Sequence, residues 1–192
     1  MLHIDAEGWL RPVRHSASPN HNQRPPGCAV ELLVIHNISL PPGCFGGGLV
    51  DALFTNRLDC ALHPSLADLD GLRVSAHLLI ERGGDITQFV SFDERAWHAG
   101  VSHFRGRENC NDFSIGIELE GTDQEPYTDV QYRRLATVTR LLRHRYPGIA
   151  LDGIVGHSDI APGRKTDPGP AFDWSRYRRD VAPAHRGRSD AE

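Results

Sequence analysis

The sequence predicts a single α/β domain in which helices flank a central mixed β-sheet. Three observations support this prediction: an almost continuous apolar run over residues 29–37, a strictly alternating segment over residues 113–121, and a helical pattern that begins near Thr128. Strands that alternate with helices along a chain favour a sheet with helices packed on it. The length of 192 residues fits one domain of this kind.

The first 28 residues are predicted to form a loop-rich segment packed on the domain. This segment contains prolines at positions 12, 19, 25 and 26, and proline interrupts regular structure. The main α/β domain is expected over residues 29–180. Residues 181–192 are charged and poor in apolar side chains, which is typical of a flexible tail.

The apolar run over 29–37, "AVELLVIHN", predicts a strand buried on both faces. Val50, Leu53 and Phe54 then recur at helical spacing and predict a short helix. Two strand-like segments, 74–80 and 85–92, flank the glycine-containing turn "ERGGD" and predict a hairpin.

The segment "FSIGIELEG" predicts a strand with two different faces. Ile115, Ile117 and Leu119 point one way, whereas Gly116, Glu118 and Glu120 point the other. The clearest helix follows, because Thr128 with Gln131 three residues later forms a capping box and "PG" at 147–148 ends the apolar stripe. Residues 150–156, "ALDGIVG", predict a last short strand. The next stretch, 156–170, has too many prolines and glycines for a helix.

Composition excludes several classes of function. The net charge is −4 with both signs mixed along the chain, which gives no electrostatic basis for binding nucleic acid or an anionic membrane. No apolar run reaches the roughly 18 residues needed to span a bilayer, and the N-terminus lacks a signal-peptide pattern. We therefore expect a cytoplasmic protein whose four scattered cysteines are reduced.

Two histidines come at the ends of predicted strands. His36 lies near the end of the apolar strand, and His157 directly follows the short strand over 150–156. Open α/β sheets bind ligands beyond the carboxyl ends of their strands, so we expect the two imidazoles to converge. Pro168 biases Asp167 toward an extended backbone. Lys165 and Asp167 then project to the same side, beside His157.

Two imidazoles and one carboxylate match a catalytic zinc site, which keeps a fourth position open for water. Such a metal lowers the pKa of that water toward about 7. Glu118 is then predicted to accept the water's proton and pass it to a leaving amine, and Lys165 to stabilise the oxyanion.

The spacing alone leaves other assignments open. Asp159 competes with Asp167 as a ligand, and His77 or His98 could replace either histidine. Glu118 and Glu120 could also be no more than the solvated face of an amphipathic strand.

Five long motifs appear in order along the chain: "VIHNISLPPG", "RVSAHLLI", "AWHAGVS", "CNDFSIGIELEGTD" and "GHSDIAPGRKTDPGPAFDW". Together they resemble the N-acetylmuramoyl-L-alanine amidase family, which shares its fold with peptidoglycan-recognition proteins, and the resemblance extends from about Gly8 to Tyr177. It implies one Zn²⁺ held by His36, His157 and Asp167. It also implies that Glu118 activates water and that Lys165 stabilises the transition state.

The resemblance further implies a substrate and a cellular role. The expected reaction is hydrolysis of the amide between the lactyl group of 1,6-anhydro-N-acetylmuramic acid and L-alanine, in cytoplasmic peptidoglycan recycling. Such an enzyme clears muropeptides that signal β-lactamase induction. We expect it to act as a monomer on a small muropeptide, with no nucleic acid and no membrane as partner.

Substrate contacts are expected from four residues. Asn37 is placed to bond the stem peptide, Trp97 to offer an aromatic face to the sugar, and Arg73 and Arg164 to grip carboxylates. Asn109 departs from the basic residue expected in some relatives, which puts peptide affinity at that position in doubt. Two rival functions remain: a binding module that does not cut muropeptide, and an amidase acting on polymeric peptidoglycan.

Overall fold

A six-stranded mixed sheet forms the centre of the computed structural model, which describes residues 1–182. The strand order is β12 (Ile154–Gly156), β5 (Leu32–Ile38), β11 (Ser114–Glu120), β6 (Leu78–Ile80), β7 (Ile86–Gln88) and β3 (Arg14–His15). The first four strands run parallel, and β6 and β7 form the predicted antiparallel hairpin. The predicted fold class is therefore confirmed.

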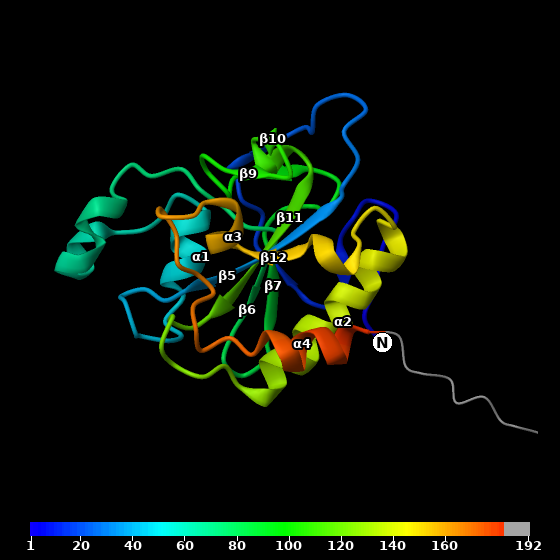
Figure 1. The fold of residues 1–192 in the computed structure, drawn as a ribbon. Coiled ribbons are helices and arrows are strands. Elements are labelled where there is room, and N and C mark those ends of the chain that lie inside the picture. Colours follow the sequence, from blue (N-terminus) through cyan, green and yellow to red (C-terminus); the bar gives the residue numbers. More distant parts are fainter. Residues whose placement is uncertain (183–192) are drawn as a thin grey trace, which may run out of the picture.

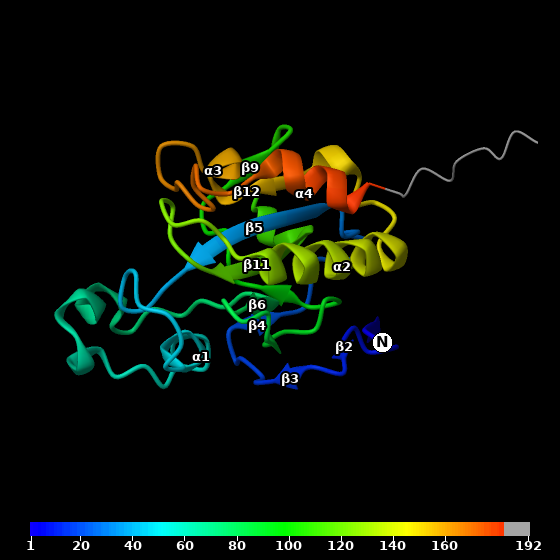
Figure 2. The same ribbon diagram turned by 90° about the horizontal axis from the view of Figure 1, so that it is seen from below.

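Helices and smaller elements surround this sheet (Figures 1 and 2). The helices are α1 (Leu49–Phe54), α2 (Asp129–Arg145), α3 (His157–Ile160) and α4 (Trp174–Val181). Four 3₁₀ turns are η1 (Cys60–Leu62), η2 (Pro64–Leu69), η3 (Cys110–Asp112) and η4 (Leu151–Gly153). Two-residue strands pair separately as β1 (His3–Ile4) with β2 (Leu10–Arg11), β4 (His21–Asn22) with β8 (Arg95–Ala96), and β9 (His103–Phe104) with β10 (Arg107–Glu108).

The two faces of the sheet are covered differently. Figure 1 shows α2 and α4 together on one face and the β9–β10 region on the other. Leu33 and Ile35 of β5 pack in the cluster that contains Leu135 and Leu142 of α2. Side chains two positions apart in a strand share a face, so the opposite face of β5 carries Leu32, Val34 and then His36. The strand thus places a histidine on the face away from α2.

Several predicted elements occur as expected. Thr128 caps α2, and its side chain and that of Gln131 form the capping box. The short helix after Gly48 and the last strand, β12, are present. The apolar run predicted a strand from residue 29, but β5 begins at Leu32. All four cysteines are free thiols.

The structure excludes one alternative and corrects one expectation. All seven residues of β11 are buried, so Glu118 and Glu120 do not form a solvated face. Protein covers that face, because β8 and η3 pack against the strand. The stretch after Gly156 was expected to contain no helix, yet one helical turn begins at His157. Asp159 accepts a hydrogen bond from the Gly156 backbone N–H at 2.7 Å and closes this turn.

Residues 1–28 contain four two-residue strands, of which β3 joins the edge of the main sheet beside β7. In the predicted tail, residues 183–192 lie outside the described part of the chain. Across residues 1–182, no helix is both long and apolar enough to span a bilayer.

Candidate metal centre and active site

Three neighbouring parallel strands deliver the candidate site at one end of the sheet. His36 near the end of β5 stands opposite Glu118 of β11 in the parallel register. On the other side of β5, strand β12 ends at Gly156, and His157 follows as the first residue of α3. Asp167 is brought to the same place by a backbone bond, in which Ser158 N–H donates to the Asp167 carbonyl at 3.0 Å.

His36, His157 and Asp167 form a compact cluster of potential metal ligands. The two Nδ1 atoms are 3.0 Å apart, and the Asp167 Oδ2 atom lies 3.0 Å from His36 Nδ1 and 3.1 Å from His157 Nδ1. Ligand atoms about 2.0–2.1 Å from a tetrahedral zinc lie roughly 3.3 Å from one another. The observed triangle fits such an ion after small side-chain movements.

The electrostatics of the cluster also suit a metal. Burial lowers the pKa of His36 to about 4, although a hydrogen bond with Asp167 opposes this change. Burial alone would raise the pKa of Asp167, but its hydrogen bonds with His157 and His36 outweigh that effect and hold the pKa below its usual value. The site therefore favours a neutral imidazole beside an ionised carboxylate, which are the forms that bind metal ions.

Glu118 and Lys165 border the same cavity of about 260 Å³ as the three potential ligands. Glu118 is 8% exposed, and within the described residues its Oε2 atom has no hydrogen-bond partner. Burial raises the pKa of Glu118 well above its usual value, the Asp167 carboxylate acts in the same direction, and Lys165 opposes both. A buried carboxyl group with an unpartnered oxygen is suited to exchange a proton with a molecule in the cavity.

Of the four predicted substrate contacts, Asn37 and Trp97 line this cavity. Asn37 donates from Nδ2 to Asp123 Oδ1 at 2.8 Å, and Trp97 donates from Nε1 to Asn22 Oδ1 at 2.7 Å. Arg73 is exposed and is not among the residues that line the cavity.

Arg164 borders a different surface cavity of about 360 Å³, which Asn109 also lines. Its guanidinium donates to the carbonyls of Ala99 and Val101, at 2.6 and 2.7 Å. The structure therefore brings Asn37 and Trp97 to the metal-site cavity, but not Arg73 or Arg164.

The alternative ligands lie outside the cluster. Asp159 bonds the Gly156 backbone, as described above. His77 is fully buried, where its Nδ1 accepts from Gly116 N–H at 3.0 Å and its Nε2 donates to the Glu94 carbonyl at 3.1 Å. His98 does not face the centre of the triangle. Its Nδ1 lies 2.9 Å from His36 Nε2, the ring nitrogen that points away from Asp167. This last contact was missed from the sequence, although "AWHAGVS" was one of the motifs.

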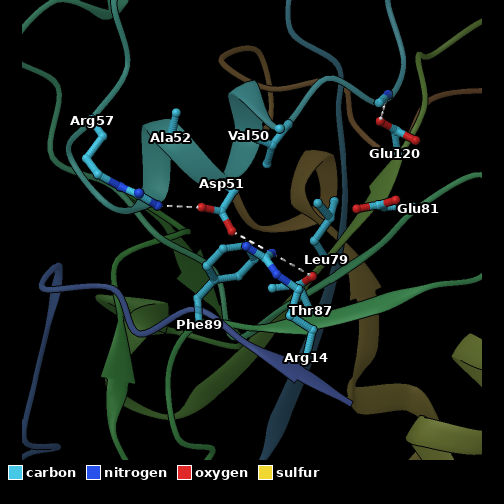
Figure 3. Close-up of a pocket in the computed structure, with 12 residues that line it drawn as sticks. Arg14, Val50, Asp51, Ala52, Arg57, Leu79, Glu81, Thr87, Phe89 and Glu120 are labelled. Carbon is cyan, nitrogen blue, oxygen red and sulfur yellow. Dashed lines mark hydrogen bonds and ion pairs between the residues drawn. The ribbon is translucent and has the colours of Figure 1, made fainter.

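A larger cavity of about 560 Å³ lies beside α1 and contains none of the three potential ligands (Figure 3). Asp51 is paired there with Arg14 and Arg57, at 2.7 and 2.8 Å. Glu120 accepts hydrogen bonds from the backbone N–H groups of Gly46 and Arg82. Most charged groups of this cavity thus have partners, whereas Glu118 Oε2 in the smaller cavity has none among residues 1–182.

Comparisons with known proteins identify the family of the chain. The family model described as N-acetylmuramoyl-L-alanine amidase matches residues 26–170. The 1,6-anhydro-N-acetylmuramyl-L-alanine amidase AmpD of Enterobacter cloacae is 62% identical over 170 residues, which cover 88% of this chain and 90% of the relative.

Two solved structures are similar as well. A crystal structure of a selenomethionine derivative of AmpD has a TM-score of 0.90 and 59% identity, and the match covers 93% of this chain and 99% of that one. The amidase AmiD of E. coli, solved with anhydro-N-acetylmuramic acid-L-Ala-D-γ-Glu-L-Lys, has a TM-score of 0.58 and 31% identity over 92% of this chain and 65% of its own. The chain therefore belongs to the N-acetylmuramoyl-L-alanine amidase family.

Proposed function

We propose that the chain is a zinc-dependent amidase of peptidoglycan recycling. It hydrolyses the amide between the lactyl group of 1,6-anhydro-N-acetylmuramic acid and the L-alanine of the stem peptide. The observation that carries this proposal is the triangle of His36, His157 and Asp167 beside the buried carboxyl of Glu118. The anhydro-muramyl specificity rests on the name of the 62% identical relative and on the substrate bound to AmiD.

His36, His157 and Asp167 are proposed to hold one Zn²⁺. Two imidazoles and one carboxylate make up a ligand set of catalytic rather than structural zinc sites. When bound there, the ion acts as a Lewis acid, which polarises a carbonyl oxygen and lowers the pKa of water. The three side chains come from separate segments of the chain, so folding itself assembles the site.

Glu118 is proposed to move the proton. It accepts a proton from the attacking water and later returns it to the departing alanine nitrogen. Its raised pKa suits both steps, because a carboxyl group that titrates nearer neutral pH can accept and donate within one cycle. Its Oε2, which has no hydrogen-bond partner in the described part of the chain, is the atom proposed to do so.

Lys165, exposed at the border of the cavity, is proposed to stabilise the negative charge that develops on the lactyl oxygen. A positioned donor of this kind contributes about 3 kcal/mol to lowering the barrier. Asn37 and Trp97 line the same cavity and are proposed to contact the muropeptide. Arg73 and Arg164 lie outside this cavity. They are therefore proposed to contact only those substrate carboxylates that lie far from the scissile amide.

The direct test is product analysis with purified 1,6-anhydro-N-acetylmuramyl tripeptide. We expect mass spectrometry to detect the free anhydro-sugar and the free tripeptide, a chelator to stop their formation, and added zinc to restore it. A muropeptide with an ordinary reducing sugar should react more slowly. Equal rates on both sugars would refute the anhydro specificity, and binding without cleavage would indicate a binding module instead.

The cytoplasmic location and the monomeric state belong to the same proposal. A small, freely diffusing muropeptide requires neither a membrane nor a second subunit. Cell fractionation and light scattering of the purified protein test these two points.

A further inference from the structure

The outer nitrogens of both candidate metal-binding histidines contact two consecutive residues. His36 Nε2 lies 2.9 Å from His98 Nδ1, and His157 Nε2 lies 3.0 Å from the Ala99 carbonyl oxygen. Both Nδ1 atoms face Asp167 on the other side of the rings. One short segment, His98–Ala99, therefore contacts both imidazoles at the ring nitrogen that does not face Asp167.

The chemistry of imidazole gives these contacts a direction. A neutral imidazole has one N–H donor and one lone-pair acceptor, and a metal ion takes the lone pair. With both Nδ1 atoms facing the metal, each Nε2 must carry the proton and needs an acceptor. The Ala99 carbonyl can only accept, so it fixes His157 in this form.

His98 can serve as the acceptor for His36 only in one tautomer. Its Nδ1 must be unprotonated, so that its Nε2 carries the proton. Ser114 Oγ lies 3.0 Å from that Nε2 and can accept from it. The hydrogen bonds then run in one direction, from His36 to His98 to Ser114.

Strand β11 makes room for this chain of hydrogen bonds. Ser114, Gly116 and Glu118 share one face of the strand because side chains alternate. A Cβ atom at Gly116 would lie 2.4 Å from Cγ of His98, so only glycine leaves space for the ring. The strand that carries the proposed proton-transfer residue also supports His98.

Asn111 fixes the backbone of the same segment. Its Oδ1 accepts from the backbone N–H groups of both His98 and Ala99, at 3.1 and 2.8 Å. Asn111 is itself 7% exposed. Asn111 therefore fixes the backbone of the segment that contacts the two candidate metal ligands.

We propose that His98 is a positioning residue, which accepts a hydrogen bond from His36 Nε2–H and so fixes His36 with Nδ1 free for the metal. This inference rests on the proposed zinc site. Removal of a partner that orients a metal-binding histidine typically weakens metal affinity about 10–100-fold.

The test uses zinc alone as the probe, in competition with a chromophoric chelator. We expect the His98→Leu variant to bind zinc about 10–100-fold more weakly than the unaltered protein. The His98→Asn variant should recover most of that loss, because its Oδ1 can occupy the position of Nδ1. The thermal stability of the zinc-free proteins is measured in parallel. If His98 had a purely structural role, zinc affinity would fall only in proportion to the loss of thermal stability. His144→Leu, at an exposed position of α2, is the control and should leave zinc affinity unchanged.

A measurement on the unaltered protein covers the case in which a variant does not fold. Nitrogen-15 NMR of the zinc-loaded protein should show His98 as the neutral tautomer protonated at Nε2. A proton on Nδ1 of His98, or undiminished zinc affinity in a folded His98→Leu variant, would overturn the inference. Failure of the unaltered protein to bind zinc would instead sink the proposed function.

Discussion

Glu118 illustrates how burial gives one side chain its proposed chemistry. The strand pattern places it on the same face as Gly116, and the register places it beside His36. Neither observation reveals that this face is covered by protein. Burial is what raises its pKa, and it leaves Oε2 without a hydrogen-bond partner among the described residues.

A Glu118→Gln substitution tests the role of this residue. Glutamine keeps the size of the side chain but cannot accept a proton, so kcat should fall by about 10²–10⁴. Zinc content should stay the same, because Glu118 is not one of the three proposed ligands. Product formation and metal analysis on the same sample measure both quantities.

Glu81→Gln provides a matched control. Glu81 lies directly after β6 and borders the larger cavity beside α1 rather than the metal-site cavity. This variant should keep its kcat. A Glu118→Gln enzyme within tenfold of the unaltered rate would contradict the proposed proton transfer.

At the scale of elements, β11 combines three functions in alternate residues: Ser114 contacts His98, Gly116 leaves space for it, and Glu118 borders the cavity. Gly116→Ala should lower the free energy of unfolding by about 1–3 kcal/mol, because the new methyl group collides with the His98 ring. Urea denaturation followed by circular dichroism measures this change.

Gly83→Ala is the control for that substitution. The nearest atom to a Cβ there is Asp85 Oδ2, at 3.8 Å, which is ordinary contact. The stability of this variant should remain close to that of the unaltered protein. Equal stability of the two alanine variants would show that the ring of His98 does not need the space at Gly116.

Sequence patterns predicted the regular elements well where periodicity and capping were strong. The capping box at Thr128, the hairpin and the alternation in β11 all depend on neighbouring residues in the chain. The turn of helix at His157 was missed because Pro162 and Gly163 follow it closely. It is closed by Asp159, whose contact with Gly156 is visible only in three dimensions.

The candidate site was predictable where it depends on strand order and was not predictable where it depends on contacts between distant segments. His36 lies near the end of β5 and His157 directly follows the adjacent strand β12, so their convergence followed from the fold class. The contacts of His98 and Asn111 depend on how a loop crosses the sheet, which no local pattern encodes. The same limit explains why Arg73 and Arg164 were expected to contact the substrate but lie outside the metal-site cavity.

At the scale of the whole molecule, a buried histidine outside the candidate metal site links stability to pH. His77 is fully buried, and burial, followed by the nearby Arg24 guanidinium, lowers its pKa to about 3. Between about pH 3 and pH 6.5, the unfolded chain binds a proton at His77 that the folded chain does not bind. Stability attributable to His77 is therefore complete above about pH 6.5 and is lost as the pH falls.

His77→Asn should make this loss less steep. The slope of the unfolding free energy against pH, between pH 6 and pH 4, should decrease by up to about 1.4 kcal/mol per pH unit. Denaturant unfolding at several pH values and constant zinc concentration measures the slope. His144→Asn, at an exposed site on α2, should leave it unaltered. An unchanged slope in His77→Asn would show that His77 is protonated in the folded protein.

The zinc content of the protein and of its Asp167→Ala variant, dialysed against the same low zinc concentration, tests the central claim most directly. The structure predicts one zinc ion per chain for the unaltered protein, because Asp167 Oδ2 completes the triangle with the two Nδ1 atoms. It predicts almost none for the variant, which lacks one of three ligands. A zinc-free protein, or a variant that still carries one ion per chain, would contradict the proposed site.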